Sequence, residues 1–386
     1  MSKHASPTLP APVLWTRGDM DRFFETLRKE GYQPVGPTLR DGAIVYDTLS
    51  STRDLPVGWG DEQEPGAYRL RKRGDEALFG YVVGPQSWKQ YLFPPRRKLW
   101  SADRAAGGLE FKPSAEAPPK YAFIGVRGCE LHALQVQDKA FLEGPYADPY
   151  YRAVREGSLV VAVNCGTSAA TCFCASMGTG PKVERGFDLA LTELLDGGQR
   201  FVVEAGSARG AKFVDELSPQ AAAPEDLAEA ARVVERTAAT LRRKVEPGGL
   251  RELLARNLEH PRWDEVASRC QTCANCTLVC PTCFCSTVED VSDLTGEHAE
   301  RWRRWDSCFT FDHSYLHGGA VRASAMSRYR QWLTHKFGTW HDQFGVSGCV
   351  GCGRCISWCP VGIDVTEELA AIRANDLGKD GEHAHP

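Results

Sequence analysis

The sequence has no long hydrophobic run and no large excess of charge of either sign. None of its apolar stretches approaches the roughly 20 residues that a helix needs to cross a bilayer. With a net charge of −4 at pH 7, the chain offers no basic surface for nucleic acid. Residues 1–12 are polar and rich in proline, without the layout of a signal peptide or of a twin-arginine signal. We therefore expect a cytoplasmic protein.

The motifs of nucleotide binding and of common catalytic sites are also absent. There is no G-x-G-x-x-G after a predicted strand, no P-loop, no nucleophile elbow and no H-E-x-x-H. The glycine-rich stretch at 348–353 carries cysteines and does not have the pattern of a phosphate loop. The sequence therefore predicts no catalytic residue and no nucleotide-binding residue.

Cysteine, by contrast, is abundant, with 15 residues in 386. The cytosol keeps thiols reduced, so structural disulfides are not expected in a chain without an export signal. The count is odd, which also argues against a complete disulfide framework. Metal ligation is the better explanation for most of these cysteines.

The strongest pattern is a run of four cysteines spaced C-x2-C-x2-C-x3-C and followed by proline, and it occurs twice. This run is the signature of bacterial ferredoxins, in which the fourth cysteine of each run binds the other cluster. Three cysteines at short intervals let one loop wrap three irons of a cube, while the fourth points away. The expected ligands of cluster A are Cys270, Cys273, Cys276 and Cys359, and those of cluster B are Cys349, Cys352, Cys355 and Cys280.

Two other metal groups fit this spacing less well. Zinc prefers paired C-x2-C knuckles separated by a longer loop, with four ligands for each ion. A c-type haem requires C-x2-C-H, and neither run has the histidine. The sequence therefore predicts two [4Fe–4S] clusters in its C-terminal third.

Four more cysteines lie upstream. Cys129 and Cys165 each follow a predicted strand, and Cys172 and Cys174 lie in one loop. Residues just past strand ends converge at the edge of an α/β sheet, where ligands usually bind. These four thiols can hold a third [4Fe–4S] cluster (cluster C), hold a structural zinc ion, or be buried thiols without a metal. Spacing alone leaves the three alternatives open.

The last three cysteines lie between the two runs, at Cys283, Cys285 and Cys308. They can ligate or hydrogen bond near a cluster, or they can be buried thiols packed beside one. Free cysteine behaves as a small hydrophobic side chain, so we favour the second interpretation.

The chain is long enough for two or three domains. Buried strands are expected at 121–126, 158–163 and 201–204, a helix at 130–141, and a linker at 207–224. Alternating strands and helices predict a layered domain. We expect an α+β protein made of an N-terminal α/β domain at 1–215, a helical linker at 216–268 and a ferredoxin-like dicluster domain at 269–386. The dicluster domain has an insertion at 282–348 and ends in a polar tail.

Several stretches together resemble one family, the beta subunits of cytoplasmic NADP-linked [NiFe] hydrogenases (sulfhydrogenases), and more distantly the equivalent iron–sulfur subunit of anaerobic sulfite reductase. Besides the second cysteine run, the resembling stretches are 123–131, 138–141, 164–165, 171–181, 276–285 and 305–308. One departure is Gly128, where the family leads us to expect proline before Cys129. The resemblance implies that Cys129, Cys165, Cys172 and Cys174 bind cluster C.

The resemblance also implies a function. It predicts a non-catalytic electron-transfer subunit of a heteromeric oxidoreductase. Its expected partners are a flavin subunit that binds NADP(H) and the small and large subunits of a [NiFe] hydrogenase. Two alternatives are the equivalent subunit of an anaerobic sulfite reductase and a stand-alone ferredoxin-type carrier. The long N-terminal domain speaks against the stand-alone carrier, which would not need it.

Overall fold

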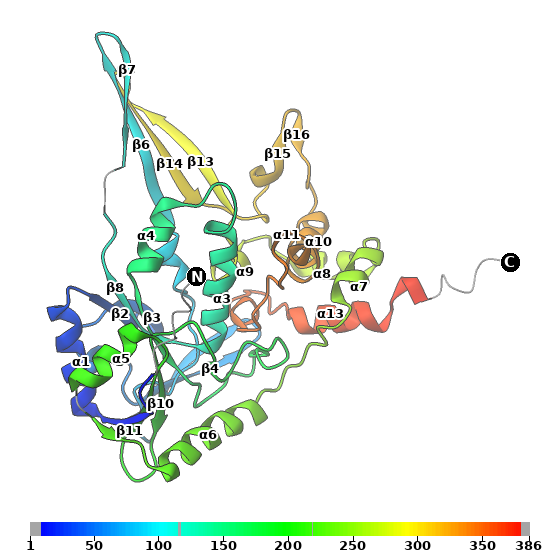
Figure 1. Ribbon diagram of the computed structural model, residues 1–386. Helices are drawn as coiled ribbons and strands as arrows, with labels where there is room; N and C mark the ends of the chain where they lie inside the picture. The colour runs from blue at the N-terminus through cyan, green and yellow to red at the C-terminus, as the bar shows by residue number, and fades with distance from the viewer. Residues whose placement is uncertain (1–8, 115–116, 218, 380–386) are drawn as a thin grey trace, which may run out of the picture.

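An eight-stranded mixed sheet forms the N-terminal part of the computed structural model, which describes residues 9–114, 117–217 and 219–379 (Figure 1). Its strands in spatial order are β12 (Gln220–Ala221), β1 (Val13–Thr16), β11 (Arg200–Ala205), β10 (Leu189–Leu194), β9 (Leu159–Val163), β8 (Tyr121–Val126), β2 (Gln33–Arg40) and β3 (Ala43–Thr48). The central neighbours β2, β8, β9 and β10 pair in parallel, and antiparallel strands form the edges. Parallel strands buried on both faces are expected to be almost entirely apolar, as β8 and β9 are.

Helices cover both faces of this sheet. One hydrophobic core lies between the sheet and two helices, α1 (Arg17–Lys29) and α5 (Ala208–Leu217). The other core lies on the opposite face, beneath α2 (Lys89–Leu92), α3 (Gly128–Phe141) and α4 (Pro149–Gly157). Alternate residues of β8 enter the two cores, with Ile124 in the first and Phe123 in the second. The layered α/β arrangement expected from the sequence is therefore confirmed.

The strands predicted at 121–126, 158–163 and 201–204 and the helix at 130–141 are all present as β8, β9, β11 and α3. The linker predicted at 207–224 is wrong, because this segment contains α5 and β12. The segment is rich in small and polar residues, but α5 has an apolar face. Phe213, Val214 and Leu217 on this face are buried in the sheet's first core. Polar residues on the outer face of an amphipathic helix are compatible with that burial.

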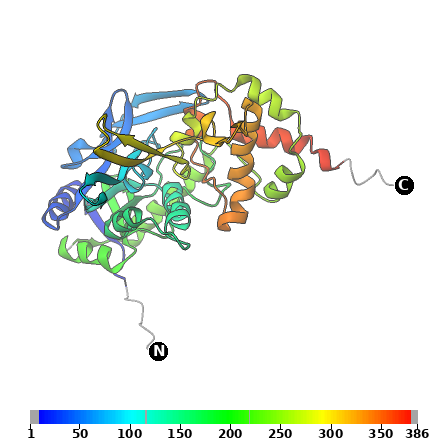
Figure 2. The ribbon, with the colours of Figure 1, turned by 90° about the horizontal axis from the view of Figure 1, so that it is seen from above.

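The C-terminal part is mainly helical and lies to one side of the sheet (Figure 2). Its helices are α7 (Leu250–Arg256), α8 (Arg262–Arg269), α9 (Asn275–Leu278), α10 (Ala325–Thr334), a π-helical turn (His335–Thr339), α11 (Trp340–Phe344), α12 (Arg354–Ser357) and α13 (Val365–Ala374). The helix before them, α6 (Pro224–Ala239), packs on the sheet, where its Val233 contacts Leu194 of β10 and Val202 of β11. A third core is built from α7, α8, α10 and α13, and several cysteines of the two runs pack against it. No helix in the described ranges is long and apolar enough to cross a membrane.

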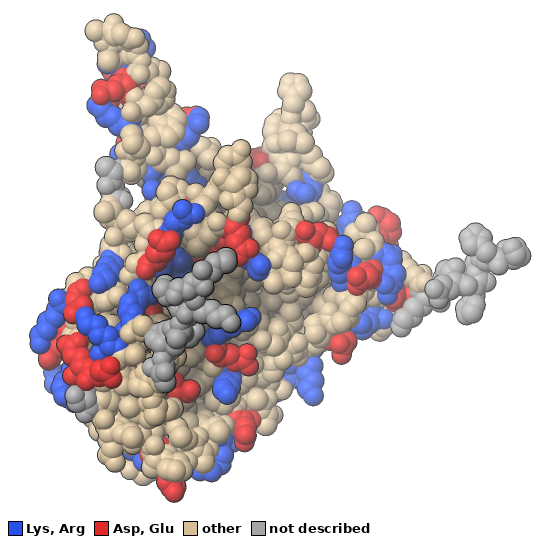
Figure 3. Space-filling model, in the orientation of Figure 1, with Lys and Arg blue, Asp and Glu red and all other residues tan. Residues whose placement is uncertain are grey.

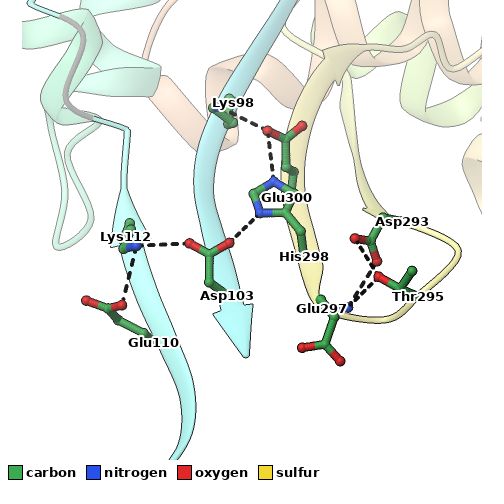
Figure 4. A network of polar contacts seen from close by, with 9 residues as sticks. All are labelled: Lys98, Asp103, Glu110, Lys112, Asp293, Thr295, Glu297, His298 and Glu300. Carbon is green, nitrogen blue, oxygen red and sulfur yellow. Dashed lines mark hydrogen bonds and ion pairs between the residues drawn. The ribbon is translucent and has the colours of Figure 1, made fainter. Parts of the chain in front are cut away.

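A four-stranded antiparallel sheet projects from the body at the top of Figure 1. Its strands in spatial order are β13 (Ser286–Ser292), β14 (His298–Trp305), β6 (Arg96–Ala105) and β7 (Gly108–Pro113). Polar contacts link the two hairpins across β6 and β14, among them His298–Asp103 at 2.6 Å and Lys98–Glu300 at 3.0 Å (Figure 4). Such exposed pairs contribute little stability, so the backbone ladder between β6 and β14 carries most of the connection. Half of this sheet comes from the insertion between the cysteine runs and half from the N-terminal part of the chain.

Smaller hairpins complete the fold. In the N-terminal half, β4 (Trp59–Glu64) pairs with β5 (Ala67–Lys72). In the insertion, β15 (Tyr315–Leu316) pairs with β16 (Gly319–Ala320) in a second projection. The hairpin β4–β5 contacts the second cysteine run: Gly66 N–H donates to Ile356 O at 3.1 Å, and Tyr68 stacks on Trp358. The N-terminal half of the chain is thus packed directly on the cysteine-rich part. The domain boundaries expected from the sequence stay a prediction.

Candidate cluster-binding site

The first cavity collects the four cysteines expected for cluster A. Its lining combines these thiols with apolar side chains such as Phe309, Tyr329 and Trp332. Its cysteines are Cys270, Cys273, Cys276 and Cys359, with Cys355 at its edge. The loop that carries the first three turns sharply, with positive φ angles of 50° at Thr272 and 69° at Ala274. Because these turns aim three thiols inward, the loop can wrap one face of a cube.

Backbone N–H groups already point at ligand sulfurs in both runs. Thr272 N lies 3.4 Å from Cys270 Sγ, and Gly351 N lies 3.4 Å from Cys349 Sγ, two residues after the first cysteine in each case. Ile363 N lies 3.3 Å from Cys359 Sγ. Hydrogen bonds to the sulfurs are one of the means by which a protein sets a cluster's potential. The two runs therefore share a local geometry as well as a spacing.

The four thiols expected for cluster B also meet. Cys355 interacts electrostatically with Cys349, Cys352 and Cys280, and with Cys276 of the first run. Burial raises the pKa of the Cys349 thiol to about 12. The fourth cysteine of the first run thus lies with the second run, and the fourth cysteine of the second run lies in the first cavity. This exchange is the one that the ferredoxin pattern predicts.

A second thiol-lined cavity lies between the N-terminal sheet and the second run. Its cysteines are Cys129, Cys165, Cys172 and Cys174, with Cys352 at its edge. Cys129 is the second residue of α3, directly after β8, and Cys165 follows β9. All four upstream cysteines therefore converge, from two neighbouring parallel strands and one loop. Burial raises the pKa of the Cys172 thiol to about 12, so in the absence of a metal this thiol stays protonated at neutral pH.

The loop carrying Cys172 and Cys174 rests on the second cysteine run. Phe173 N–H donates to Gly351 O at 2.9 Å, and Thr179 Oγ1 donates to Val350 O at 2.6 Å. Gly351 has a φ of +64°, and a Cβ there would lie 2.7 Å from Cys174 N. Only glycine permits so close an approach in this conformation. The loop that carries Cys172 and Cys174 is therefore packed closely against the loop of cluster B.

Close packing also explains why residue 128 is glycine and not the proline expected from the family pattern. A Cβ at this position would lie 2.8 Å from Lys182 O and 3.0 Å from Thr179 O. Proline, which the family pattern led us to expect here, would place its Cβ against these carbonyl groups. Glycine lets the segment after Cys174 pack against the start of α3, so the departure does not disturb the cavity.

Two buried arginine side chains have unpaired donors, and these donors indicate whether the sites suit an iron–sulfur cluster. Arg354 Nη1 and Arg127 Nε are buried without a hydrogen-bond partner in the described part of the chain. Arg127 lines the second cavity, and the Arg354 guanidinium interacts electrostatically with Cys352. No three His, Cys, Asp or Glu side chains in the described ranges converge as a single-ion site requires. The sulfides and thiolates of a cluster are anionic and accept hydrogen bonds. The cysteine thiols together with the two buried arginines therefore fit an iron–sulfur cluster.

Glu130 joins these parts, and the sequence pattern assigned it no role, although it lies in the family-like stretch 123–131. Its carboxylate accepts hydrogen bonds from Tyr46 Oη at 2.7 Å and Trp88 Nε1 at 3.0 Å and forms an ion pair with Arg354. The Glu130 and Arg354 side chains are 1% and 0% exposed. Buried carboxylates are tolerated only with such full hydrogen bonding. Glu130 thus links α3, which carries Cys129, to α12 in the second run.

Lys336 is a second functional candidate that the spacing did not indicate. It is buried, and its ammonium lies 3.3 Å from Cys280 Sγ, 2.8 Å from Thr282 Oγ1 and 3.0 Å from Gly348 O. Burial alone would lower the pKa of Lys336, but the thiols of Cys280 and Cys283 raise it above its usual value. Cluster B therefore has a fixed positive charge beside one of its expected ligands.

We expect the substitution Lys336→Met to lower the reduction potential of cluster B. Reduction adds one negative charge to the cluster, and the nearby ammonium stabilises the reduced state. The expected shift is about 60 mV or more, which is a tenfold change for a one-electron couple. An EPR-monitored redox titration of anaerobic protein measures it. Lys98→Met, in the projecting sheet where Lys98 pairs with Glu300, is the matched control and should leave every potential unchanged; a similar shift in both variants would contradict the assignment.

Comparison with known proteins agrees with this geometry. Residues 269–363 match the family described as the 4Fe-4S dicluster domain, so this part of the chain holds two [4Fe–4S] clusters. Over 320 residues the chain is 34% identical to sulfhydrogenase 2 subunit beta of Pyrococcus furiosus, and the match covers 82% of this chain and 92% of the relative. No solved structure shows a significant match.

Proposed function

The chain belongs to the family of sulfhydrogenase beta subunits, an assignment that makes it an iron–sulfur electron-transfer subunit of a hydrogenase, and from this premise we propose its place in the electron path. It relays electrons between a flavin subunit that binds NADP(H) and a [NiFe] hydrogenase module. Three clusters carry the electrons, with cluster C bound by the upstream set of thiols. The terminal chemistry takes place in the partner subunits.

The observation that carries this proposal is the sharing of cysteines between neighbouring sites. Cys355, expected in cluster B, lines the cavity of cluster A, and Cys352, also expected in cluster B, lines the cavity of cluster C. Cluster B therefore lies between the other two. Such a row suits the transfer of single electrons from one end to the other and does not suit the binding of a substrate.

The two ends of this row differ in their exposure. Cys129, Cys172 and Cys174 of the upstream site are each at most 7% exposed. At the other end Cys273 is exposed, and a surface groove of about 1160 Å³ reaches Cys359. The end of the row at cluster A is thus the more accessible to a partner that docks on this side.

Exposed apolar side chains on the two projections support a heteromeric complex. On the four-stranded sheet these include Phe111 at 60% and Leu294 fully exposed, and on the smaller hairpin Leu316 at 65%. Figure 3 shows few charged side chains toward the end of the smaller projection. Exposed apolar surface of this kind is typical of protein–protein contacts.

Affinity purification of the full chain from its native cells under anaerobic conditions tests the proposal. Recovery of a nickel-containing large subunit together with a flavin subunit is the expected result. Recovery of a sirohaem subunit would instead place the chain in a sulfite reductase. Recovery of the chain alone, with its clusters intact, would favour a stand-alone carrier.

A further inference from the structure

Three cysteines lie outside the thiol sets of the three expected clusters, and they are not alike. Cys283 is buried and hydrogen bonds to Cys280, so it belongs to the surroundings of cluster B. Cys285 and Cys308 are only partly buried, and their side chains hydrogen bond to each other. This pair is a thiol couple that no cluster assignment uses.

The backbone holds the two sulfurs together. The ladder between β13 and β14 ends at the pair Ser286–Trp305. One step further, Asp306 N–H donates to Cys285 O at 2.9 Å. Cys308 follows two residues later, and its backbone N–H donates to the sulfur of Cys285. Paired strand ends keep the backbones close, as a disulfide requires.

A histidine and a carboxylate complete the group. The His313 side chain hydrogen bonds to Cys285, and its Nδ1 lies 2.7 Å from Asp306 Oδ2. Thr310 Oγ1 donates to the other oxygen of Asp306 at 2.8 Å. The thiol of Cys285, the imidazole of His313 and the carboxylate of Asp306 are thus arranged as the nucleophile, the base and the orienting group of an activated thiol. Hydrogen bonds from Cys308 and His313 lower the pKa of Cys285, which favours its thiolate form.

Both cysteines are partly exposed. A surface cavity lies beside them and is lined by Trp305, Asp306 and Ser307, the three residues that precede Cys308, together with Leu278 and Arg304. The two cysteines do not line this cavity themselves, so a small molecule would reach the thiol pair at the exposed part of their side chains.

We propose that Cys285 and Cys308 form a thiol–disulfide exchange site that accepts small disulfides, with Cys285 as the attacking thiol and Cys308 as the resolving thiol. The Cys285 thiolate attacks one sulfur of R–S–S–R, forms a mixed disulfide and releases RS⁻, which takes a proton from the His313 imidazolium. The Cys308 thiol then gives its proton to His313 and attacks the Cys285 sulfur. The second RS⁻ leaves and takes that proton. The small disulfide is reduced to two thiols, and the cysteine pair is oxidised to a disulfide.

The test uses the full chain, purified anaerobically with its clusters, and bis(2-hydroxyethyl) disulfide as the probe. After alkylation of the remaining thiols, non-reducing peptide mass mapping is expected to show a Cys285–Cys308 bond. Cys308→Ala should retain the hydroxyethylthio group on Cys285, because the resolving thiol is missing. Cys285→Ala should slow the release of 2-mercaptoethanol at least tenfold. Lys98→Met, in the projecting sheet and outside this group, should react as the wild type does.

His313→Gln distinguishes a positioning role for the histidine from a merely structural one. It should slow the first exchange step at pH 7 while leaving the iron content unchanged. Modification spread evenly over several cysteines, or a wild-type chain without the Cys285–Cys308 bond, would overturn the proposal. Neither result bears on the electron relay, because the readout is the exchange chemistry and not cluster reduction.

Discussion

Anaerobically purified Cys172→Ala protein is expected to contain about eight irons and eight acid-labile sulfides per chain, against about twelve of each in the wild type. Cys172 lines one cavity with the other three upstream cysteines, Cys129, Cys165 and Cys174. A cube that loses one of its four thiolates is expected to be lost or degraded. The EPR spectrum after dithionite reduction should lose the signal of one interacting cluster. Iron and sulfide analysis together with this spectrum is the measurement.

Cys285→Ala is the matched control for this experiment. Cys285 is a partly buried cysteine that lines neither of the two thiol cavities. This variant should keep about twelve irons per chain. If the wild type itself held only about eight, the upstream thiols would bind no cluster. If Cys172→Ala held about twelve, another donor would take the place of Cys172.

The sequence anticipated the local features that repeat or alternate. The two cysteine runs have a fixed spacing, and the buried strands β8 and β9 are continuous apolar segments. The helix α3 has apolar residues at helical spacing, and its position after β8 is what the sheet requires to bring Cys129 next to Cys165. These patterns depend on residues near one another in the chain, so they can be recognised without a structure.

What the sequence could not supply are contacts between distant segments. The ion pair of Glu130 with Arg354 and the contact of Lys336 with Cys280 join residues 224 and 56 positions apart. The pairing of β6 with β14 likewise depends on the path of the whole chain. The helix α5 was missed for a different reason, because its few apolar residues are a weak local signal and their burial is decided by the sheet. Tertiary packing overrides local composition in such cases.

Arg354 takes part in several contacts between distant segments. Its replacement by methionine is expected to lower the stability of the protein strongly. Arg354 donates to Gly84 O at 2.9 Å, pairs with Glu130 and interacts electrostatically with Cys352. The substitution leaves the Glu130 carboxylate buried without its cation. Removing one partner of a buried ion pair typically costs about 3–5 kcal/mol. We expect the thermal midpoint to fall by about 10 °C.

The double variant Glu130→Gln with Arg354→Met shows whether the unpaired charge is the cause. The amide oxygen of glutamine can still accept from Trp88 Nε1, its nitrogen can donate to Tyr46 Oη, and the amide carries no charge. The double variant should therefore be more stable than Arg354→Met alone, because the buried charge is gone, and the two substitutions should not be additive. Anaerobic thermal scans at one fixed rate, followed by far-UV circular dichroism and by cluster absorbance, measure both changes. Strictly additive losses would mean that Glu130 and Arg354 act separately and that the contact between α3 and α12 does not depend on their pairing.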